Sequence, residues 1–594
     1  MKILSQDLAV LLSQATLDAF PTLSGEEVLN ALSVDEPRDA KHGEFATGLA
    51  MKLSKRVGKA PQAIAEAIIE HFPKDYRVQA VEFAAPGFLN LKLSDAFLQE
   101  GLKQLESGFS VERGVDGGAK EERPWIVEYS STNAAKHMGV HHIITTILGD
   151  ALANLIEFMG HEVIRINHLG DWGTHFGKLI YAVEEWGDKA AIEKKPNDEL
   201  TRLYVKFHEE AEKDSNLEGK ARDIFKALEE GDEERLALWK WMVEESVGDL
   251  KKIFKRLGVE FDHITGESFY LNRTDEVISD GLQKKAFVEG EGGALIYPMG
   301  LDAKGEEMTP ALIRKSDGTT LYLTRDLATI KYRVETWHPE VILYVVDHAQ
   351  SLHFVQNFAV ARALAYDRLP TASVEAMVTS LEHISFGRMS FGDRAMSTRK
   401  GNVIKLTEIL DEAVKRAGAL AAQRASELPR EELYALAEGV GVASVKYGIL
   451  SQDRNKDLVF DWDKIITLEG NSAPYLLYSY ARASSILQKA EAQFGLLDLS
   501  GLPLLCEDAE KAMVKKMLKF PEALQRALEE RKPHIVATFL YELCQEFNRF
   551  YGTVQVVNAE TEAARRARLG IVKSFLQELK CGLSILGIPA LDRM

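Results

Sequence analysis

The chain has 594 residues, 46% of them hydrophobic, and a formal net charge of −18. That length allows several cores at about 150 residues per domain. No stretch approaches the roughly 20 uninterrupted apolar residues of a membrane helix, so we expect a cytoplasmic protein without a membrane partner. The negative charge disfavours indiscriminate nucleic-acid binding, although a selective binder can hold basic residues on one surface. The three cysteines fall late without a close pair, so neither a disulfide framework nor a metal site is predicted.

Residues 1–110 are predicted to form a small α/β domain. Helical patterns occur at 6–20, 45–57 and 61–71. Residues 78–94 alternate like two strands joined around a Pro-Gly turn. The Gly- and charge-rich residues 111–122 that follow indicate a linker.

The chain is organised around residues 127–176, which are predicted to form a strand, a polar turn, a helix and a second strand. The helix has one apolar face, made by Ile144, Ile147, Leu148, Ala151, Leu152, Leu155, Ile156 and Met159. A strand, helix and strand of this length predict a parallel pair with a right-handed crossover. The start of the helix therefore lies at the carboxyl edge of a parallel sheet, where free N–H groups and the helix dipole favour phosphate.

Lysine and histidine residues crowd the start of this predicted helix, at Lys136, His137, His141 and His142. Such residues are often solvated polar decoration, and the pattern alone leaves that interpretation open beside phosphate binding. The remaining motifs of the chain have to distinguish the two.

Further along, residues 184–266 are highly charged and helical and contain three tryptophans, which indicates a scaffold inserted into the core. Gly170 and Gly173, around Trp172, are predicted to shape a turn. Residues 321–333 and 341–354 are each predicted to place a strand before polar residues. The pattern is helical throughout 408–594. The lysines at 515, 516 and 519 could supply a local patch for nucleic acid, but such runs more often form a solvated helix face.

Several of these strings resemble the arginyl-tRNA synthetases of class I. Their first signature is matched at Glu128, Tyr129, Ser130, Asn133, Lys136 and His142. The family's first His falls on Gly139 and its Gly falls on His141, so GVHH stands in place of HxGH. Residues 395–402, AMSTRKGN, resemble the second signature, and LGDWG at 169–173 also resembles the family. The strings GEFATGLAMKLSK and APGFLNLKLS resemble its amino-terminal domain, and residues 461–482 resemble the start of its anticodon-binding domain.

The resemblance implies an α/β fold with a Rossmann-like catalytic core. The implied parts are a tRNA-contacting α/β domain at 1–110, a linker at 111–122, a catalytic domain at 123–407 with a helical insertion at about 184–266, and an α-helical anticodon-binding domain at 408–594. The implied function is that of an arginine–tRNA ligase, which activates L-arginine with ATP and transfers it to the 2′-hydroxyl of the terminal adenosine of tRNA(Arg). Mg²⁺ is expected to accompany ATP, and the chain is expected to act as a monomer.

The resemblance also maps site residues onto this sequence. The catalytic residues would be Lys136, His141, His142, Arg399 and Lys400. The ATP-binding residues would be Lys136, His137, Gly139, His142, Met396 and Ser397. The arginine-binding residues would be Glu128, Asn133, Tyr322, Asp326 and Gln350. The tRNA-binding residues would be Asn471, Tyr475, Tyr480 and Arg482.

The chemistry of a guanidinium agrees with the mapped arginine site. A guanidinium is a planar fork of five donors without an acceptor, so it needs rigid carboxylate and carbonyl acceptors. Glu128 or Asp326 can supply the opposite charge, Asn133 and Gln350 can supply orienting hydrogen bonds, and Tyr322 can supply an aromatic wall. Any one of them alone would be an ordinary surface or capping residue.

Two rival functions stay open at the sequence level. A paralogue that binds tRNA or arginine but has lost adenylation is suggested by GVHH, because a side chain at His141 would stand where the family leaves room for adenine. A generic nucleotidyltransferase that does not use RNA would leave both flanking domains unexplained.

Overall fold

The computed structural model describes residues 3–37, 39, 42–108, 123–302, 304–316, 318–369, 377–391, 405–424, 429–495, 499 and 503–594. The predicted linker at 111–122 lies outside these residues. Contacts divide the chain into two compact units. One unit combines Met1–Gly118 with Thr467–Met594, and the other is Ala119–Ile466.

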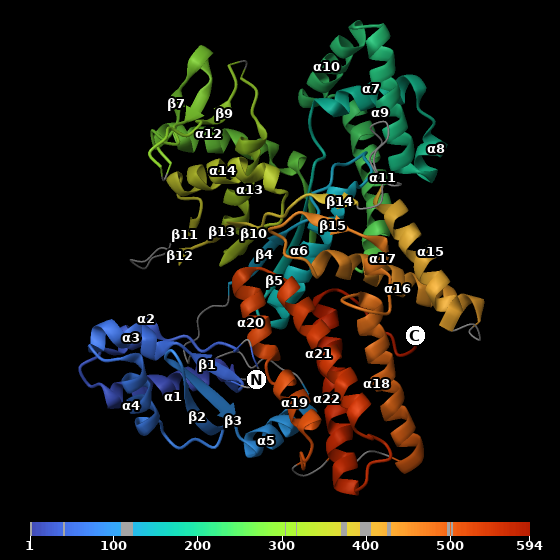
Figure 1. Ribbon diagram of the computed structural model, residues 1–594. Coiled ribbons are helices and arrows are strands. Elements are labelled where there is room, and N and C mark those ends of the chain that lie inside the picture. The colour runs from blue at the N-terminus through green and yellow to red at the C-terminus, as the bar shows by residue number, and fades with distance from the viewer. Residues whose placement is uncertain are drawn as a thin grey trace. The chain divides into compact units, whose positions relative to one another are not determined.

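The second unit is built on a five-stranded parallel sheet in the order β13-β10-β4-β5-β6 (Figure 1). Its strands are β4 Trp125–Glu128, β5 Val163–Leu169, β6 His263–Gly266, β10 Val341–Tyr344 and β13 Ser380–His383. Every residue of the central strand β4 is buried, as expected where helices cover both faces of a parallel sheet. The predicted α/β core with a parallel β4–β5 pair is therefore confirmed.

Helix α6, Val140–Phe158, makes the crossover from β4 to β5. Its apolar face packs closely on the strand below, because a Cβ added at Gly149 would lie 2.2 Å from the Cβ of Tyr129. On α6 a buried ion pair joins Asp150 to Lys446 at 3.6 Å. The close approach fixes the helix over the sheet and, with it, the place where the helix begins.

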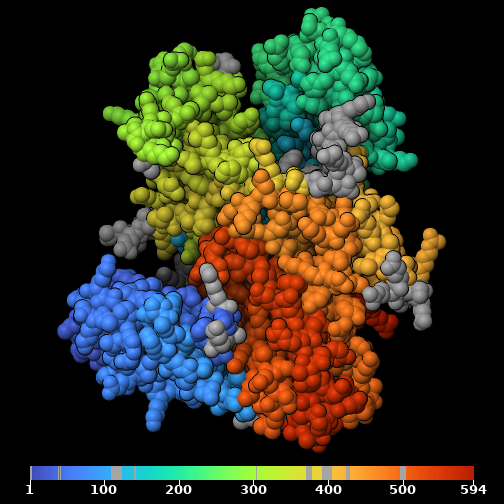
Figure 2. Space-filling view, viewed as in Figure 1, coloured from blue at the N-terminus to red at the C-terminus, as the bar shows by residue number. Residues whose placement is uncertain are grey.

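A helical lobe separates β5 from β6, where the sequence predicts an insertion. It consists of α7 Thr174–Trp186, α8 Lys189–Lys194, α9 Pro196–Lys213, α10 Asn216–Glu229 and α11 Glu233–Leu257. Trp239 of α11 joins the lobe to the core, since its Nε1–H donates to the carbonyl of Asp171 at 2.8 Å and its ring packs edge-on against Trp172. In Figure 2 this green lobe and the lime-coloured segment that follows β6 stand apart, with a hollow between them.

The segment between β6 and β10 carries short strands and two of the helices near the sheet. Its elements are η2 Glu267–Arg273, α12 Thr274–Gln283, β7 Val288–Glu289, η3 Glu291–Gly293, β8 Leu295–Tyr297, β9 Ala311–Arg314 and α13 Tyr322–Trp337. After β10 come η4 His348–Gln350, α14 Ser351–Ala363, β11 Arg368–Leu369, β12 Met377–Val378 and, after β13, β14 Met389–Phe391.

The strand predicted within 321–333 is wrong, because this stretch begins helix α13. The residues it buries include Leu323, Leu327, Ile330 and Val334. Their three- and four-residue steps are those of one helix face, and this face joins the apolar core beside the sheet. The second strand of that prediction, within 341–354, is confirmed as β10.

Residues 405–466 pack with the core unit rather than with the helices that follow. They form α15 Leu406–Arg424, α16 Arg430–Leu450, β15 Leu458–Phe460 and α17 Trp462–Ile465. Within the part of the chain that the structure describes, only α16 has the length and apolar composition to cross a membrane, and 72% of its apolar window is buried inside the protein. That burial is typical of a core helix.

The first unit begins with a small α/β domain around a three-stranded antiparallel sheet, β1-β3-β2. Its elements are α1 Leu4–Ala19, α2 Gly25–Ala31, β1 Phe45–Thr47, α3 Leu49–Val57, α4 Pro61–His71, β2 Val78–Ala84, β3 Phe88–Leu93 and α5 Asp95–Glu106. The helix predicted from residue 45 begins only at Leu49, so the prediction is wrong over its first four residues. Phe45 to Thr47 pair with β3 instead, so Phe45 lies opposite Leu91.

Among the described residues this unit is completed by the helices α18 Ala473–Phe494, α19 Asp508–Met517, α20 Phe520–Glu530, α21 His534–Thr553 and α22 Glu562–Ile585. Helix α5 packs against α19 and α22 (Figure 1). The lysines considered above as a nucleic-acid patch are used in ion pairs. Lys515 lies 2.7 Å from Glu44, Lys516 lies 2.6 Å from Glu542, and Lys519 pairs with Glu36 at 2.5 Å.

Candidate functional site

The topology of the sheet determines where a ligand can bind. From β4 the chain proceeds to β5 and β6 on one side and later returns to β10 and β13 on the other side. In open parallel sheets, ligands bind outside the carboxyl ends of the strands where the order reverses in this way. Here that place is the end of β4 and β10, beside Glu128 and Tyr344.

The turn after β4 has an unusual backbone. Ser130, Ser131 and Ala135 have φ values of 71°, 42° and 63°, in a region that residues other than glycine rarely adopt. Neighbouring side chains hold the turn in place. The N–H of Ser130 donates to Oγ1 of Thr145 on α6 at 3.1 Å, and the N–H of Ala135 donates to Oγ of Ser246 on α11 at 2.8 Å. Held strain of this kind is typical of ligand-binding turns.

The first turn of α6 is closed by one of the predicted histidines. The N–H of Gly139 donates to Nδ1 of the buried His142 at 3.0 Å. Since Nδ1 is an acceptor, the neutral ring carries its proton on Nε2. His142 is thus fixed at the helix start, and Gly139 serves as the N-cap residue. The side chain of His141 lies outside the described part of the chain.

Lys136 and His137, the two other basic candidates of the first signature, contact helix α9 of the insertion. The amine of Lys136 lies 5.5 Å from the ring centre of Tyr204. Nε2 of His137 lies 3.2 Å from Oδ1 of Asp198, which is also 2.8 Å from the amine of Lys405. Burial, together with the charge of Lys405, lowers the pKa of His137, so this ring is neutral at pH 7.

The second signature, with Met396, Ser397, Arg399 and Lys400, lies outside the described residues. The chain directly after it is placed, and it returns to the first signature. Lys405 forms an antiparallel bridge with Gly139, and the N–H of Leu406 donates to the carbonyl of Met138 at 3.0 Å. The segment that follows the second signature therefore begins beside the start of α6.

Glu128, predicted to bind arginine, has a partner inside the protein. Oε2 of Glu128 lies 2.5 Å from Nη1 of Arg333, and the side chain of Arg333 is fully buried. Burial alone would lower the pKa of Arg333, but the charge of Glu128 raises it. The charge of Glu128 is thus already balanced by a guanidinium of the chain itself. Arg333 was not among the predicted site residues because its segment was expected to form a strand. On a helix, residues seven apart such as Asp326 and Arg333 share a face.

Asp326 lies on α13, the same helix as Arg333, but nearer to its start. Oδ2 of Asp326 is 2.6 Å from Nε2 of His353 on α14. Burial opposes a charge on His353, but the hydrogen bond and charge of Asp326 raise its pKa above the usual value. The charges of Glu128 and Asp326 both raise the pKa of the buried Tyr344 hydroxyl, after the larger effect of its burial. The structure thus places both carboxylates around the end of β10.

The other three predicted arginine-binding residues are more open. Tyr322 begins α13 and is 66% exposed. Gln350 ends η4 and is exposed, as is Asn133 in the turn after β4. Asn133 pairs by its backbone with Gly170, where an added Cβ would lie 2.2 Å from Oδ1 of Asn133. The turn role predicted for Gly170 therefore includes a close approach to the side chain of Asn133.

Glu267 is a third carboxylate at this edge and was not among the predicted site residues. It directly follows β6, and one of its oxygens lies 2.8 Å from Nε of Arg325. Burial raises its pKa, and the charge of Asp326 adds to this effect. The signal that could have identified it is its position directly after a strand, at the edge where the other candidates meet.

Several buried polar atoms at this edge have no hydrogen-bond partner among the described residues. They include both side-chain polar atoms of Asn167, Nδ1 of His168 and the hydroxyls of Ser131 and Thr132. Buried polar groups in folded proteins are nearly always paired. A polar ligand at the carboxyl edge would give these atoms partners.

The residues predicted to bind tRNA lie at the start of α18. The hydroxyl of Tyr475 accepts from Nδ2 of Asn548 at 2.8 Å, and Nη1 of Arg482 donates to Oδ1 of the same residue at 2.6 Å. The guanidinium of Arg482 lies over the ring of Tyr551 at 5.5 Å. Asn471 is exposed just before the helix. Tyr480 is only 8% exposed, so its ring packs in the core instead of facing solvent.

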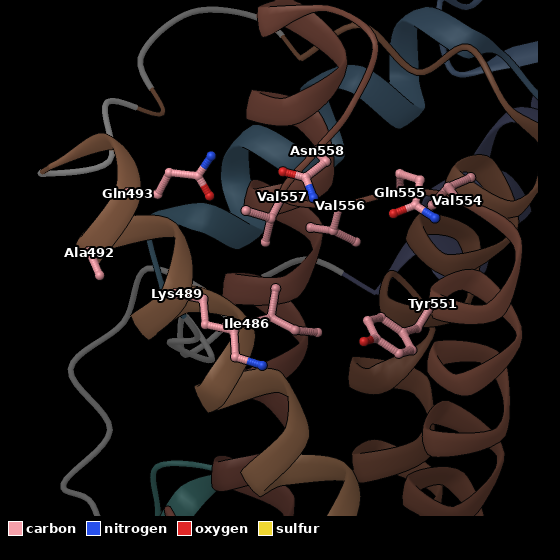
Figure 3. A pocket seen from close by; sticks show the side chains of 10 residues that line it. All are labelled: Ile486, Lys489, Ala492, Gln493, Tyr551, Val554, Gln555, Val556, Val557 and Asn558. Atoms are coloured by element: carbon pink, nitrogen blue, oxygen red, sulfur yellow. The ribbon is translucent and has the colours of Figure 1, made fainter.

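A pocket of about 710 Å³ opens beside this cluster. Its lining comes from α18, from the end of α21 and from the segment after α21: Ile486, Lys489, Ala492, Gln493, Tyr551, Val554, Gln555, Val556, Val557 and Asn558. Figure 3 shows the amine of Lys489 and the hydroxyl of Tyr551 pointing into it from opposite sides. An aromatic ring, a cation and amide groups around one hollow suit an unstacked base.

Comparison with known families agrees with this architecture. The model of "tRNA synthetases class I (R), catalytic domain" matches residues 109–462, more than half of the chain. The models of "Arginyl tRNA synthetase N terminal domain" and "DALR anticodon binding domain" match residues 4–93 and 476–594. The switch-point site and these matches define a class I tRNA synthetase.

Relatives over the full length identify the branch. The chain is 37% identical over 596 residues to an arginine–tRNA ligase of Fusobacterium nucleatum, with 100% of both chains covered. It is 38% identical over 566 residues to one of Alkaliphilus metalliredigens, covering 94% of this chain and 95% of the relative. The chain belongs to the arginyl-tRNA synthetase family, as its signatures predicted.

Solved structures support the fold. Arginyl-tRNA synthetases of Plasmodium falciparum and Thermus thermophilus each match with a TM-score of 0.82 and 23% identity, and 100% of both chains is covered in each case. The predicted fold class, with its Rossmann-like core, amino-terminal α/β domain and helical carboxyl-terminal domain, is confirmed.

Proposed function

We propose that this chain is an arginine–tRNA ligase that uses ATP. The observation that carries the proposal is the family membership along the full length, together with carboxylates at the switch point of the sheet. In the first step an oxygen of the arginine carboxylate attacks the α-phosphorus of ATP and pyrophosphate leaves. In the second step the 2′-hydroxyl of the terminal adenosine of tRNA(Arg) attacks the carbonyl carbon and AMP leaves.

The guanidinium of arginine is proposed to bind near Asp326. Glu128 is balanced by Arg333 at 2.5 Å, so its charge contributes less to the recognition of a second guanidinium. Among the described residues the ion-pair partner of Asp326 is a histidine, whereas Glu267, like Glu128, already lies beside an arginine. Tyr322 and Gln350, both exposed, would close over the side chain, and Asn133 would orient the other end of the amino acid.

ATP is proposed to bind at the start of α6. The helix of 19 residues directs its N–H groups and positive dipole end toward this place. Lys136, His137, Gly139 and His142 would contact the nucleotide, with Met396, Ser397, Arg399 and Lys400 approaching from the second signature. Catalysis would rest on position and on charge stabilisation as pyrophosphate departs. Mg²⁺ would enter with ATP.

The tRNA is proposed to bind through Tyr475, Arg482 and the pocket beside Tyr551, where an anticodon base can stack. Asn471 remains a candidate at the exposed start of α18. Tyr480 is excluded from this surface because its ring is buried. We further propose that the enzyme acts as a monomer in the cytoplasm.

The test is arginine-dependent exchange of labelled pyrophosphate into ATP by the full-length protein, with and without tRNA(Arg). A ligase produces exchange that requires arginine. The rival, a paralogue that has lost adenylation, would bind arginine and tRNA without any exchange. The rival is not favoured, because the relatives reported above are named arginine–tRNA ligases and the match covers 94–100% of this chain.

A further inference from the structure

One carboxylate of the inserted lobe holds two basic groups from distant parts of the chain. Oδ1 of Asp198, on α9, lies 2.8 Å from the amine of Lys405 and 3.2 Å from Nε2 of His137. The side chains of Asp198, Lys405 and His137 are 42%, 36% and 22% exposed. A dissolved ligand can therefore reach all three.

Backbone hydrogen bonds determine the position of Lys405 independently of this ion pair. Lys405 is bridged to Gly139, the N-cap residue of α6, and the N–H of Leu406 bonds to the carbonyl of Met138. The side chain of Lys405 therefore starts directly beside the positive end of the helix dipole. Two sources of positive potential, the helix end and the amine, share one small region.

The charges of this group are unequal at neutral pH. The hydrogen bond from Lys405 lowers the pKa of Asp198 despite an opposing effect of burial, so Asp198 is ionised. His137 is neutral, since burial and Lys405 lower its pKa. The contact is thus a single, partly exposed ion pair, and such pairs contribute little to stability. A ligand with several negative charges can displace the carboxylate from the amine.

We propose that Lys405 is a further ligand of the ATP triphosphate and that Asp198 holds its amine until the nucleotide binds. This inference rests on the proposed function. A lysine amine is a compact point charge with three donors, which suits phosphate oxygens. The triphosphate outcompetes Asp198 because it carries more charge and lies at the helix start. Asp198 thereby competes with ATP for Lys405.

This arrangement makes the two partners act in opposite directions. Lys405→Met removes a phosphate ligand and should weaken ATP binding by about tenfold, as loss of a charged hydrogen bond does. Asp198→Asn removes the competitor and should strengthen ATP binding by roughly two- to fivefold, the range of one exposed ion pair. The double variant should resemble Lys405→Met, because Asp198 then has no amine to hold. A purely structural ion pair predicts that both single variants weaken binding or leave it unchanged.

The experiment measures ATP binding to the full-length protein by titration calorimetry and the KM for ATP and for arginine in pyrophosphate exchange with tRNA(Arg). Lys415→Met is the matched control, since Lys415 is on α15 and pairs with Glu412 at 3.1 Å in solvent. Thermal unfolding checks that each variant is folded. The control and the KM for arginine should stay within about twofold of the wild type, a range worth less than 0.5 kcal/mol.

Opposite effects of the two single variants on ATP binding support the inference. Effects of equal sign, or no effect of Lys405→Met, overturn it. Absence of arginine-dependent exchange in the wild-type protein would instead overturn the proposed function. ATP binding by calorimetry would still decide the role of Lys405 in that case.

Discussion

Asp326→Asn tests the arginine pocket most sharply, because it removes one charge and keeps the shape of the side chain. A hydrogen bond to a charged group contributes about 1.5–3 kcal/mol, which corresponds to roughly a 10- to 150-fold loss in kcat/KM for arginine. The KM for ATP should change by less than about twofold, because Asp326 lies on α13 and the start of α6 is built from other residues.

The assay is pyrophosphate exchange in the presence of tRNA(Arg), with arginine and ATP varied in turn. Glu276→Gln is the matched control, since Glu276 also pairs with a base on α13, Lys331 at 3.5 Å, but its side chain is 52% exposed. The control should leave both KM values unchanged. Equal losses for arginine and ATP in Asp326→Asn would refute the placement of the pocket.

Three further predictions concern stability and RNA binding. Arg333→Met leaves Glu128 buried without its partner and should cost about 3–5 kcal/mol; adding Glu128→Gln should restore part of the lost thermal stability, and a double variant still less stable than Arg333→Met would contradict the pairing. Burial raises the pKa of Glu106 from 4.5 to about 7. The folded state then binds more protons between these values, so this group makes stability fall as pH rises through that range. Glu106→Gln should therefore gain thermal stability over the wild type at pH 8 relative to pH 5, and an equal difference at both pH values would contradict this. Tyr551→Ala should raise the KM for tRNA by the loss of one stacking contact, about 1–3 kcal/mol, while the KM for arginine stays constant; an unchanged KM for tRNA would remove the pocket from the RNA surface.

The elements that were predicted correctly are those specified by local pattern. The apolar face of α6 and the strands on either side of it repeat at the period of their own structure. Segment 321–333 was misread because its apolar residues also admit a short strand. The three- and four-residue steps of its buried residues indicate a helix face, and this face packs in the apolar core beside the sheet. Phe45 to Thr47 were misread because a local pattern does not show the partner of a strand. Their partner strand lies more than 40 residues further along the chain.

Charge pairing was the least predictable part of the site. The sequence identifies Glu128, Asp326 and His137 as chemically suitable residues, but their partners are far away in the chain. Arg333 lies 205 residues after Glu128, and Lys405 lies 207 residues after Asp198. The lysines of α19 likewise resemble an RNA-binding patch until Glu44 is brought beside them. Electrostatic roles depend on such pairs, and only the folded chain brings them together.

The most direct test of the central claim is the transfer of labelled amino acid to tRNA(Arg) by the full-length protein with ATP. We expect arginine to be attached to the 2′-hydroxyl of the terminal adenosine, whereas lysine, which has an amine in place of the guanidinium fork, should not be attached. Charging with lysine at a comparable rate would contradict the arginine pocket. Binding of arginine and tRNA without any charging would contradict the ligase function itself.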